Sequence, residues 1–321
     1  MRGDFIDVSV TEVRSEADRV VSLRLTRDDQ ADLPSWEPGA HIEVAIEDGT
    51  IRQYSLCSDP EDARSWRIGV LRETNGRGGS ERLHTVAEPG LRLAVRGPHH
   101  TFPYRPDRER TLFVAGGIGI TPILPMLAAA ERAGADWRLI YLGAAEATMA
   151  FVPELLPYGD RVDVLPASRT GRVDIEAQVA RFTEGGPANI VACGPERLLD
   201  ALEKYAADRP ELTLTSERFS PQAPEAAAPV AGDEVGFEVE TRDGRVVKVA
   251  PDETILDALD RAGVRTLSSC RQGTCGTCET PVLAGIPDHR DDLLTDEEHA
   301  ENATMLLCVS RSCGPRLTLD V

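Results

Sequence analysis

The chain has 321 residues, 41% of them hydrophobic and 28% charged, which is enough for two or three domains with hydrophobic cores. Its formal net charge of −19 argues against nucleic acid or an anionic membrane surface as a partner and favours a partner with a basic patch. No apolar run approaches the ~18 residues that span a bilayer, and we expect neither a secretory leader nor membrane binding.

The first hundred residues have the pattern of short strands separated by turns. Apolar and polar residues alternate, and Gly and Pro close each run at short intervals, which is typical of an antiparallel barrel or sandwich. We expect no long amphipathic helix among them. The six expected strands are 5–13, 19–27, 41–48, 52–58, 66–73 and 91–98.

The fourth of these strands begins with Arg52, Gln53, Tyr54 and Ser55. On a strand, Arg52 and Tyr54 share one face while Gln53 and Ser55 share the other. An arginine fork suits a phosphate, an aromatic ring suits a flat heterocycle, and a hydroxyl can hydrogen-bond its polar edge. The alternative is a solvated arginine beside a half-buried tyrosine.

A glycine-rich loop, residues 75–80, follows the fifth strand. Backbone N–H groups around Gly78 and Gly79, together with the side chains of Arg77 and Ser80, could cradle an anion. Alone, the loop could equally be an ordinary turn. Because it accompanies the RQYS segment and precedes an α/β pattern, we interpret both as a flavin phosphate site.

From about residue 110 strands alternate with helices, which predicts a parallel sheet covered by helices on both faces. This is a nucleotide-binding architecture. The expected strands are 111–115, 137–145, 161–168, 189–192 and 212–219.

Two turns at strand ends in this region are candidates for contacting a dinucleotide. The first contains Gly117, Ile118 and Gly119, then Thr121, which could cap the next helix, whose N-terminus would attract a pyrophosphate. It is not the G-x-G-x-x-G fingerprint. The second turn is Cys193, Gly194 and Pro195 at the carboxyl edge, where ligands bind in such sheets; Cys193 could also be simply a buried small side chain.

Four cysteines near the C-terminus have the spacing C-x4-C-x2-C and then one more, which is the plant-type pattern for a [2Fe–2S] cluster. They are Cys270, Cys275, Cys278 and Cys308. Gly273 and Gly276 would let the loop fold tightly around the cluster. A zinc site or a disulfide pair is the alternative, but zinc favours paired C-x2-C units and disulfides favour secreted domains. Thiolate ligands in a chain without a leader predict a cytoplasmic protein.

Two further features bear on partners and metals. The six histidines have no spacing typical of an oxygen-activating metal site. The acidic stretch 288–302, which includes Asp291, Asp292, Glu297 and Glu298, is a candidate docking face for a partner, or else simply a solvated loop.

The order RQYS, GRGGS, GGIGITP, CGP, ERF and C-x4-C-x2-C…C resembles the phthalate dioxygenase reductase family, the single-chain reductases of Rieske oxygenases. The resemblance covers essentially the whole chain. It implies a multidomain protein with an antiparallel β-barrel flavin domain, a parallel α/β NAD-binding domain and a C-terminal α+β ferredoxin domain resembling a β-grasp. The expected segments are 1–105, 106–221, a linker at 222–234, and 235–321.

The resemblance also implies the cofactors and their ligands. A C-terminal ferredoxin implies FMN, held by Arg52, Gln53, Tyr54, Ser55, Arg77, Gly78, Gly79 and Ser80, with Phe219 over the flavin face. NADH would meet Gly117, Ile118, Gly119 and Thr121, with Cys193, Gly194 and Pro195 beside the nicotinamide. NADH would give a hydride to the flavin, and the electrons would leave singly through the cluster. No acid or base residue is expected to be catalytic.

Several alternatives stay open. Ser168, Arg169 and Arg172 resemble the residues with which NADPH-dependent ferredoxin reductases bind a 2′-phosphate, so NADPH competes with the expected NADH. The partner is expected to be a Rieske aromatic dioxygenase or demethylase, with a cytochrome P450 as the alternative acceptor. A non-catalytic iron–sulfur carrier or redox sensor is the alternative from another class. We expect a monomer.

Overall fold

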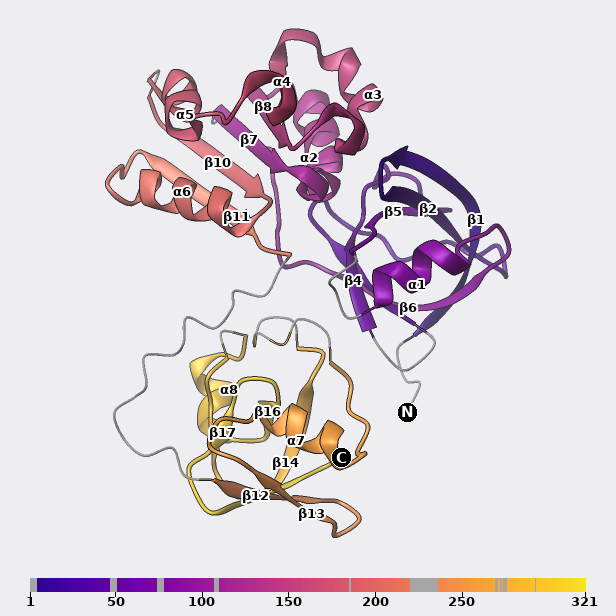
Figure 1. Ribbon diagram of the computed structural model, residues 1–321, viewed down its shortest axis with the longest axis vertical. Coiled ribbons are helices and arrows are strands. Elements are labelled where there is room, and N and C mark those ends of the chain that lie inside the picture. Colours follow the sequence, from indigo (N-terminus) through magenta and orange to yellow (C-terminus); the bar gives the residue numbers. More distant parts are fainter. Residues whose placement is uncertain are drawn as a thin grey trace. The chain divides into compact units, whose positions relative to one another are not determined.

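The computed structural model forms two compact units, which are described separately. The first unit carries the strands up to β11, and the second carries β12 to β18 (Figure 1). The expected linker at 222–234 lies outside the described residues. The structure describes residues 5–46, 51–73, 78–106, 110–184, 186–219, 236–268, 271, 273, 276–291 and 293–321.

A six-stranded antiparallel sheet in the order β4-β3-β6-β1-β2-β5 forms the first part of the first unit. A single antiparallel bridge joins Leu56, directly after β4, to Ile68 in β5, so the two edge strands meet and the sheet curls into a barrel. The strands are β1 Ile6–Ala17, β2 Val20–Arg27, β3 His41–Ala45, β4 Ile51–Ser55, β5 Trp66–Leu71 and β6 Arg92–His99. The expected antiparallel barrel is confirmed.

One short helix in the barrel region has no counterpart in the sequence prediction. Helix α1, Gly79–Val86, begins directly after Gly78, whose φ of 79° only glycine adopts without strain. The sequence pattern predicts a loop here because only Gly79 and Leu83 of this helix are buried, which is too few for a recognisable apolar period.

The second sheet is parallel, in the order β11-β10-β7-β8-β9. Its strands are β7 Arg110–Gly116, β8 Trp137–Gly143, β9 Val162–Pro166, β10 Ala188–Cys193 and β11 Leu212–Glu217. The connecting helices are α2 Ile120–Arg132, α3 Val152–Leu155, α4 Ala167–Thr170, α5 Ile175–Thr183 and α6 Glu196–Ala207, with 3-10 turns η1 Gly117–Gly119, η2 Glu146–Thr148 and η3 Leu156–Arg161.

Alternate residues of the central strand β7 enter two different cores. Leu112 and Val114 pack in the core that contains apolar residues of α5 and α6, whereas Phe113 and Ala115 pack in the core that contains those of α2. The parallel sheet is therefore covered on both faces, as the alternation of strands and helices predicts. Two apolar faces explain why β7 is a nearly continuous apolar run.

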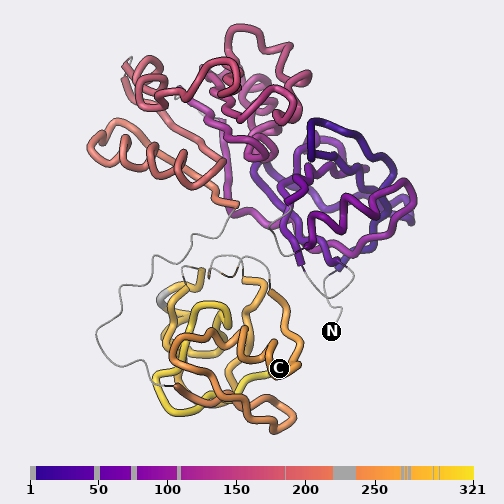
Figure 2. The backbone as a smooth tube through the Cα atoms, in the orientation of Figure 1, coloured from indigo at the N-terminus to yellow at the C-terminus, as the bar shows by residue number. Residues whose placement is uncertain are grey.

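The barrel and the parallel sheet share one of these cores. Val20 of β2 and Phe102 and Tyr104, which follow β6, belong to the same buried cluster as Phe113 and the apolar face of α2. The rings of Tyr104 and Phe113 meet edge to face with their centroids 5.1 Å apart. In Figure 2 the indigo and purple barrel and the magenta and salmon parallel sheet belong to this first unit.

The second unit contains a five-stranded sheet in the order β13-β12-β18-β14-β16 and a two-stranded sheet of β15 and β17. Strands β12 and β18 run parallel, and the other pairs are antiparallel. The strands are β12 Phe237–Thr241, β13 Val246–Val249, β14 Glu279–Ala284, β15 Pro287–Asp288, β16 Thr304–Leu306, β17 Arg311–Ser312 and β18 Arg316–Leu319, and the helices are α7 Ile255–Arg261 and α8 Asp296–Glu301.

Helix α7 follows the antiparallel pair β12 and β13. The side chain of Thr254 caps it by accepting a hydrogen bond from the amide of Asp257 at 3.1 Å. Among the described residues no helix is both long enough and apolar enough to cross a membrane.

Candidate functional site

Two glycine turns lie side by side at the point where the strand order of the parallel sheet reverses. Strand β7 pairs with β8 on one side and with β10 on the other, so the carboxyl ends of β7 and β10 flank the point where the strand order reverses. Ligands of such sheets bind in the crevice at this point. The turns that follow these two strands carry the residues predicted to bind the dinucleotide.

The two turns pack backbone against backbone. A Cβ on Gly119 would lie 2.3 Å from the carbonyl oxygen of Cys193, and a Cβ on Gly194 would lie 2.9 Å from Cα of Gly116. A Cβ on Gly116 would likewise meet Cδ of Pro195 at 2.5 Å. These distances are below any real Cβ contact, so only glycine fits at the three positions. The close approach that these glycines allow is therefore between the two turns.

The first turn differs in detail from the expected cap. Gly117 has a φ of 55°, Gly117 to Gly119 form η1, and α2 begins at Ile120 with no side-chain cap. Thr121 lies inside the helix rather than capping it; its hydroxyl donates to the carbonyl of Ile118 at 2.9 Å, and the residue is 2% exposed. No side chain caps α2, although the amide of Ile120 donates to the carbonyls of Gly117 and Ile118. A helix start without a side-chain cap can attract an anion.

The second turn carries a buried thiol and a buried carboxyl group. Cys193 is fully buried, and burial, reinforced by the charge of Glu217, raises the pKa of its thiol well above the usual range. Glu217 is the register partner of Cys193 on β11. Part of Glu217 is exposed, but its Oε2 is buried without a hydrogen-bond partner among the described residues, and burial raises the pKa of the carboxyl to about 8.

Glu217 is a site residue that sequence reasoning missed. The signal was its position at the end of a strand, in the ERF segment from which only Phe219 was selected. Phe219 follows β11 and is 43% exposed, so its ring is available for contact with a ligand.

The barrel brings β4 against the start of α1. A Cβ on Gly79 would lie 2.8 Å from Nε and 2.9 Å from Cγ of Arg52, so the guanidinium lies over the first residue of the helix. The hydroxyl of Ser80 accepts a hydrogen bond from the amide of Glu73 at 3.1 Å. A positive side chain beside a helix N-terminus suits a phosphate group. Arg77 lies outside the described residues.

The other residues of β4 provide the polar and aromatic groups that a flat heterocycle needs. Ser55 is buried, and burial raises the pKa of the Tyr54 hydroxyl, which is thus a neutral donor at physiological pH. The amide Nε2 of Gln53 is buried without a hydrogen-bond partner among the described residues. A buried donor without an acceptor is costly, and a polar ligand edge would relieve that cost.

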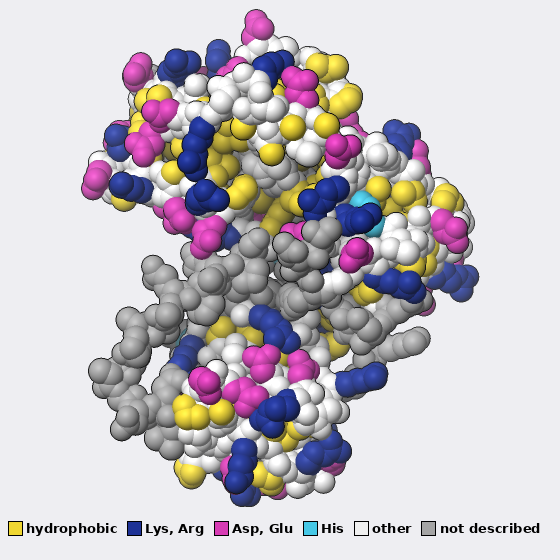
Figure 3. Space-filling model, in the orientation of Figure 1, with side chains coloured by type: hydrophobic (Ala, Val, Ile, Leu, Met, Phe, Trp, Pro, Cys, Tyr) yellow, Lys and Arg dark blue, Asp and Glu magenta, His cyan; other side chains and the backbone are white. Residues whose placement is uncertain are grey.

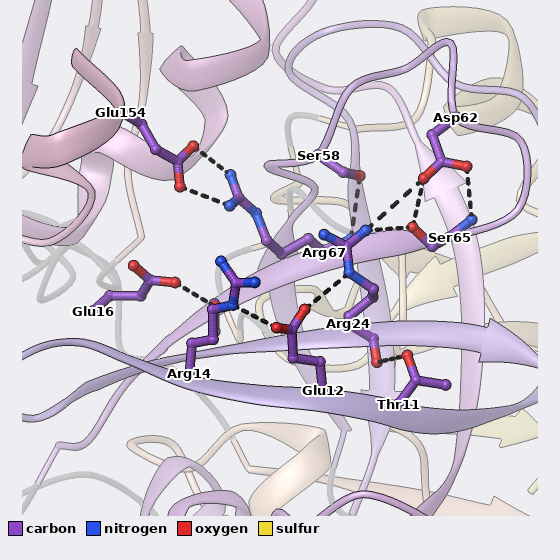
Figure 4. A network of polar contacts seen from close by, with 11 residues as sticks. Thr11, Glu12, Arg14, Glu16, Arg24, Ser58, Asp62, Ser65, Arg67 and Glu154 are labelled. Atoms are coloured by element: carbon purple, nitrogen blue, oxygen red, sulfur yellow. Dashed lines mark hydrogen bonds and ion pairs between the residues drawn. The ribbon is translucent and has the colours of Figure 1, made fainter. Parts of the chain in front are cut away.

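The barrel contacts the dinucleotide turn directly. A Cβ on Gly69 of β5 would lie 2.7 Å from Cγ2 of Thr121, so the backbone of β5 lies against the start of α2. Figure 4 shows a second contact between the two parts, in which Arg67 of β5 reaches Glu154 of α3. Its Nη1 and Nη2 donate to the two carboxylate oxygens at 2.7 and 2.8 Å, and Nη2 also donates to the carbonyl of Cys57.

The segments that follow β8 and β9 carry one charge each, and the two charges are opposite. Nη1 of Arg169 in α4 lies 2.9 Å from Oε1 of Glu146, and both side chains are exposed. Arg169 was a candidate for binding a 2′-phosphate, and Arg172 beyond it is exposed. The structure thus adds an acidic side chain that sequence reasoning did not consider at this edge of the sheet.

Two of the four predicted cluster ligands can be placed. Cys278 precedes β14 and Cys308 follows β16, both are 4% exposed, and both belong to the core of the second unit. Strands β14 and β16 are antiparallel partners, and the amide of Leu307 donates to the carbonyl of Cys278, so the two cysteines lie at the same end of the pair. Cys270 and Cys275 lie outside the described residues.

The glycines around the three-cysteine loop behave as predicted. Gly273 has a φ of 77° and Gly276 a φ of 72°, which are values that favour glycine. A Cβ on Gly273 would lie 2.7 Å from Val309 and 3.0 Å from Asp291. Gly273 is therefore packed tightly against Val309 and Asp291. Cys313 is exposed, and its thiol lies 3.4 Å from the carbonyl of Pro287.

The acidic stretch 288–302 is only partly available to a partner. Glu297 and Glu298 are exposed, but the side chain of Asp291 has no exposed surface and cannot contact another protein. Asp292 lies outside the described residues. On the face drawn in Figure 3, Lys and Arg side chains lie among Asp and Glu side chains, and no continuous basic patch of the kind that binds nucleic acid is visible on that face.

The comparisons with known proteins agree with these observations. Residues 238–313 match the family described as a 2Fe-2S iron-sulfur cluster binding domain. The phenoxybenzoate dioxygenase subunit beta of Ectopseudomonas oleovorans is 39% identical over 98% of this chain and 97% of its own length.

Two solved structures are similar along nearly the whole chain. Phthalate dioxygenase reductase, described as a modular structure for electron transfer from pyridine nucleotides to [2Fe-2S], is 31% identical with a TM-score of 0.72 over 99% of this chain and 98% of its own. A type IV self-sufficient cytochrome P450 monooxygenase is 40% identical with a TM-score of 0.77 over 99% of this chain, which corresponds to 41% of that longer protein.

The full-length similarity, the barrel, the parallel sheet and the C-terminal cluster-binding domain lead to one assignment, and they confirm the predicted fold class and oxidoreductase activity. The chain belongs to the phthalate dioxygenase reductase-like family, the reductase components of oxygenases, and it transfers electrons from NAD(P)H through a flavin to a 2Fe-2S cluster.

Proposed function

We propose that this protein takes electrons from NADH, passes them through FMN and a [2Fe–2S] cluster, and delivers them to a Rieske oxygenase, either an aromatic dioxygenase or a demethylase. One observation supports the step from NADH to FMN. The backbone of β5 in the barrel lies against Thr121 at the start of α2, so the two parts that would hold flavin and dinucleotide are in direct contact.

The FMN proposal rests on the groups gathered around β4. Arg52 over the start of α1 suits a terminal phosphate, while Tyr54, Ser55 and the unpartnered Nε2 of Gln53 suit the ring of a flavin. Gly78, Gly79 and Ser80 would supply the helix N-terminus, and Arg77 would join them. When bound, FMN supplies the chemistry of accepting two electrons as a hydride and releasing them singly.

The dinucleotide proposal uses the two glycine turns at the switch point. Gly117, Ile118, Gly119 and Thr121 would position the pyrophosphate at the N-terminus of α2. Cys193, Gly194 and Pro195 would lie beside the nicotinamide, and Phe219 would cover the flavin until the nicotinamide displaces it. Cys193 is a buried neutral thiol, so its proposed role is to shape the pocket rather than to attack a substrate.

The preference for NADH rests on Glu146. Its carboxylate forms an ion pair with the guanidinium of Arg169, the residue that would otherwise attract a 2′-phosphate. A carboxylate at this edge repels the extra phosphate of NADPH and can accept a hydrogen bond from a ribose hydroxyl. NADPH use would therefore require Arg169 to leave Glu146.

The cluster proposal assigns Cys270, Cys275, Cys278 and Cys308 as the four thiolate ligands. The burial of Cys278 and Cys308 at one end of the β14 and β16 pair supports it, because a cluster needs its ligands close together and shielded from water. Thiolate ligands also support the proposed cytoplasmic location. Monomeric state and the absence of nucleic acid and membrane partners remain predictions.

A P450 acceptor is the second candidate, and the similarity to part of a self-sufficient P450 monooxygenase favours it. A non-catalytic iron–sulfur carrier would have no use for the paired glycine turns or for the residues around Gly79, so we do not favour it.

The test is an anaerobic absorption titration of the full-length protein with NADH, with NADPH in a parallel series. We expect one FMN and one two-iron cluster per chain, and bleaching of flavin and cluster bands together at lower concentrations of NADH than of NADPH. FAD in the extract would refute the FMN assignment. A protein that binds neither flavin nor iron after reconstitution would refute the whole path.

A matched pair of variants tests the phosphate site. Arg52→Ala should lower bound FMN at least tenfold while the iron content stays the same, because a charge-assisted contact to phosphate is worth roughly 1.5–3 kcal/mol. Arg92→Ala is the control, since Arg92 is an exposed arginine of the same barrel that pairs with Asp28. Equal FMN loss in both variants would contradict a specific role for Arg52.

A further inference from the structure

Three metal-binding side chains converge in the second unit, outside the predicted cluster ligands. His289 follows β15, Asp291 lies two residues later, and His299 lies in α8. One ligand atom from each residue lies within 4.8 Å of the other two. Nε2 of His299 is 3.3 Å from Oδ2 of Asp291, and Nδ1 of His289 is 3.7 Å from Oδ1 of the same carboxylate.

The burial of this group is unusual for three polar side chains. The side chain of Asp291 has no exposed surface, that of His289 is 9% exposed and that of His299 is 27% exposed. The two imidazole rings stack with their centroids 4.4 Å apart. Neither ring nitrogen of His289 has a hydrogen-bond partner among the described residues. A buried imidazole without partners is costly unless something else occupies its nitrogens.

The carboxylate is also held in place by hydrogen bonds from two groups other than the histidines. Oδ2 of Asp291 accepts a hydrogen bond from the amide of Leu294 at 2.9 Å, and Oδ1 accepts one from the hydroxyl of Ser310 at 3.4 Å. The Asp291 carboxylate, held in place in this way beside the unpartnered imidazole of His289, can therefore bind a cation.

We propose that His289, Asp291 and His299 form a binding site for one divalent transition-metal ion of the zinc type, separate from the iron–sulfur cluster. Two imidazole nitrogens and one carboxylate oxygen match the donors that zinc prefers, and three protein ligands leave one position open for water. The ion would join α8 to the segment that contacts Gly273 in the cluster loop. The histidine spacing did not predict this site because β15, its following loop and α8 assemble it in space.

The competing explanation is a hydrogen-bonded cluster without a metal. In that case His299 donates to Asp291 and His289 merely stacks on His299. The two explanations differ in zinc uptake, which can be measured on the loaded protein without reference to its electron transfer.

The experiment uses full-length protein with intact flavin and cluster, no histidine tag, and prior dialysis against a mild chelator. Zinc chloride is titrated calorimetrically, and zinc and iron are then measured in the dialysed product. We expect one zinc per chain with the iron content unchanged. His289→Ala, His299→Ala and Asp291→Asn should each weaken zinc binding by roughly 100-fold or more, since even outer-shell partners are worth up to that factor.

Two control variants separate this site from other zinc ligands. His100→Ala removes an exposed histidine of the barrel, and Cys313→Ser removes the exposed thiol; both should bind zinc like the unaltered protein. Absence of zinc uptake would overturn the proposal. So would zinc uptake that displaces iron in proportion and persists in the histidine variants.

A second measurement covers the case in which a variant loses its cluster. The unaltered protein, with its cluster oxidised and therefore silent in electron paramagnetic resonance, is loaded with one equivalent of Cu²⁺. We expect nitrogen couplings from two imidazole ligands. A spectrum without imidazole nitrogen coupling would overturn the proposal independently of any substitution.

Discussion

The buried carboxyl of Glu217 should make the first unit less stable as pH rises. Burial raises the pKa of this group to about 8 in the folded protein, against 4.5 when it is unburied. Below pH 4.5 the carboxyl is protonated in both the folded and the unfolded protein, so it has no effect on the free energy of unfolding. Between these pKa values the unfolded chain releases a proton that the folded chain keeps, so stability falls as pH rises and the loss is complete above pH 8.

The magnitude follows from the same two pKa values. Each pH unit between them lowers the free energy of unfolding by about 1.4 kcal/mol. The carboxyl therefore lowers it by roughly 2 kcal/mol at pH 6 and by roughly 5 kcal/mol at pH 9. Because part of the residue is exposed, we take these values as upper bounds. Glu217→Gln removes the titration, so its free energy of unfolding relative to the unaltered protein should rise by up to about 3 kcal/mol between pH 6 and pH 9.

The assay is urea unfolding of the full-length protein followed by tryptophan fluorescence. The three tryptophans, Trp36, Trp66 and Trp137, all lie in the first unit, so the signal reports that unit alone. Glu211→Gln is the control, because Glu211 is exposed at the opposite end of β11. If the difference between Glu217→Gln and the unaltered protein is the same at pH 6 and pH 9, the carboxyl is not buried as described.

Three further predictions concern the dinucleotide side of the protein. Gly119→Ala should lower kcat/KM for NADH at least tenfold with flavin and iron contents unchanged, because the new Cβ would lie 2.3 Å from the carbonyl oxygen of Cys193; steady-state assays that show normal kinetics would contradict the tight packing. Glu146→Ala should raise kcat/KM for NADPH relative to NADH by about fivefold, the value of a like-charge contact of roughly 1 kcal/mol in water, and an unchanged ratio would refute the role given to Glu146. Glu154→Gln should lower the Tm of the first unit by about 2–4 °C, since a partly exposed pair with Arg67 is worth up to ~1 kcal/mol, and calorimetry in high salt should show the difference shrinking.

The sequence was sufficient for most of the architecture because the strands carry strong signals. All six barrel strands and all five parallel strands were predictable from alternation, apolar runs and the Gly and Pro residues that end them. Helix α1 was not, because an eight-residue helix that buries only Gly79 and Leu83 has almost no apolar period.

The candidate sites were predictable to the extent that their residues are contiguous. The glycine turns and the cysteines stand in short segments with recognisable spacing, so they could be selected directly. Glu217 could not, because its raised pKa depends on burial beside β10. The group of His289, Asp291 and His299 escaped notice because its members are joined by a loop and a helix rather than by a regular period. Thr121 was misjudged as a cap, since η1 moves the helix start to Ile120.

The contact between the two glycine turns limits how this reductase could be re-engineered. Because Gly116, Gly119 and Gly194 each leave no room for a Cβ, neither turn can be altered without shifting the other. A change of coenzyme by redesign is thus more accessible at the far edge of the same crevice, where Glu146 and Arg169 are exposed and meet only through a surface ion pair. The proposed coenzyme crevice thus has one inflexible half and one half that tolerates substitution.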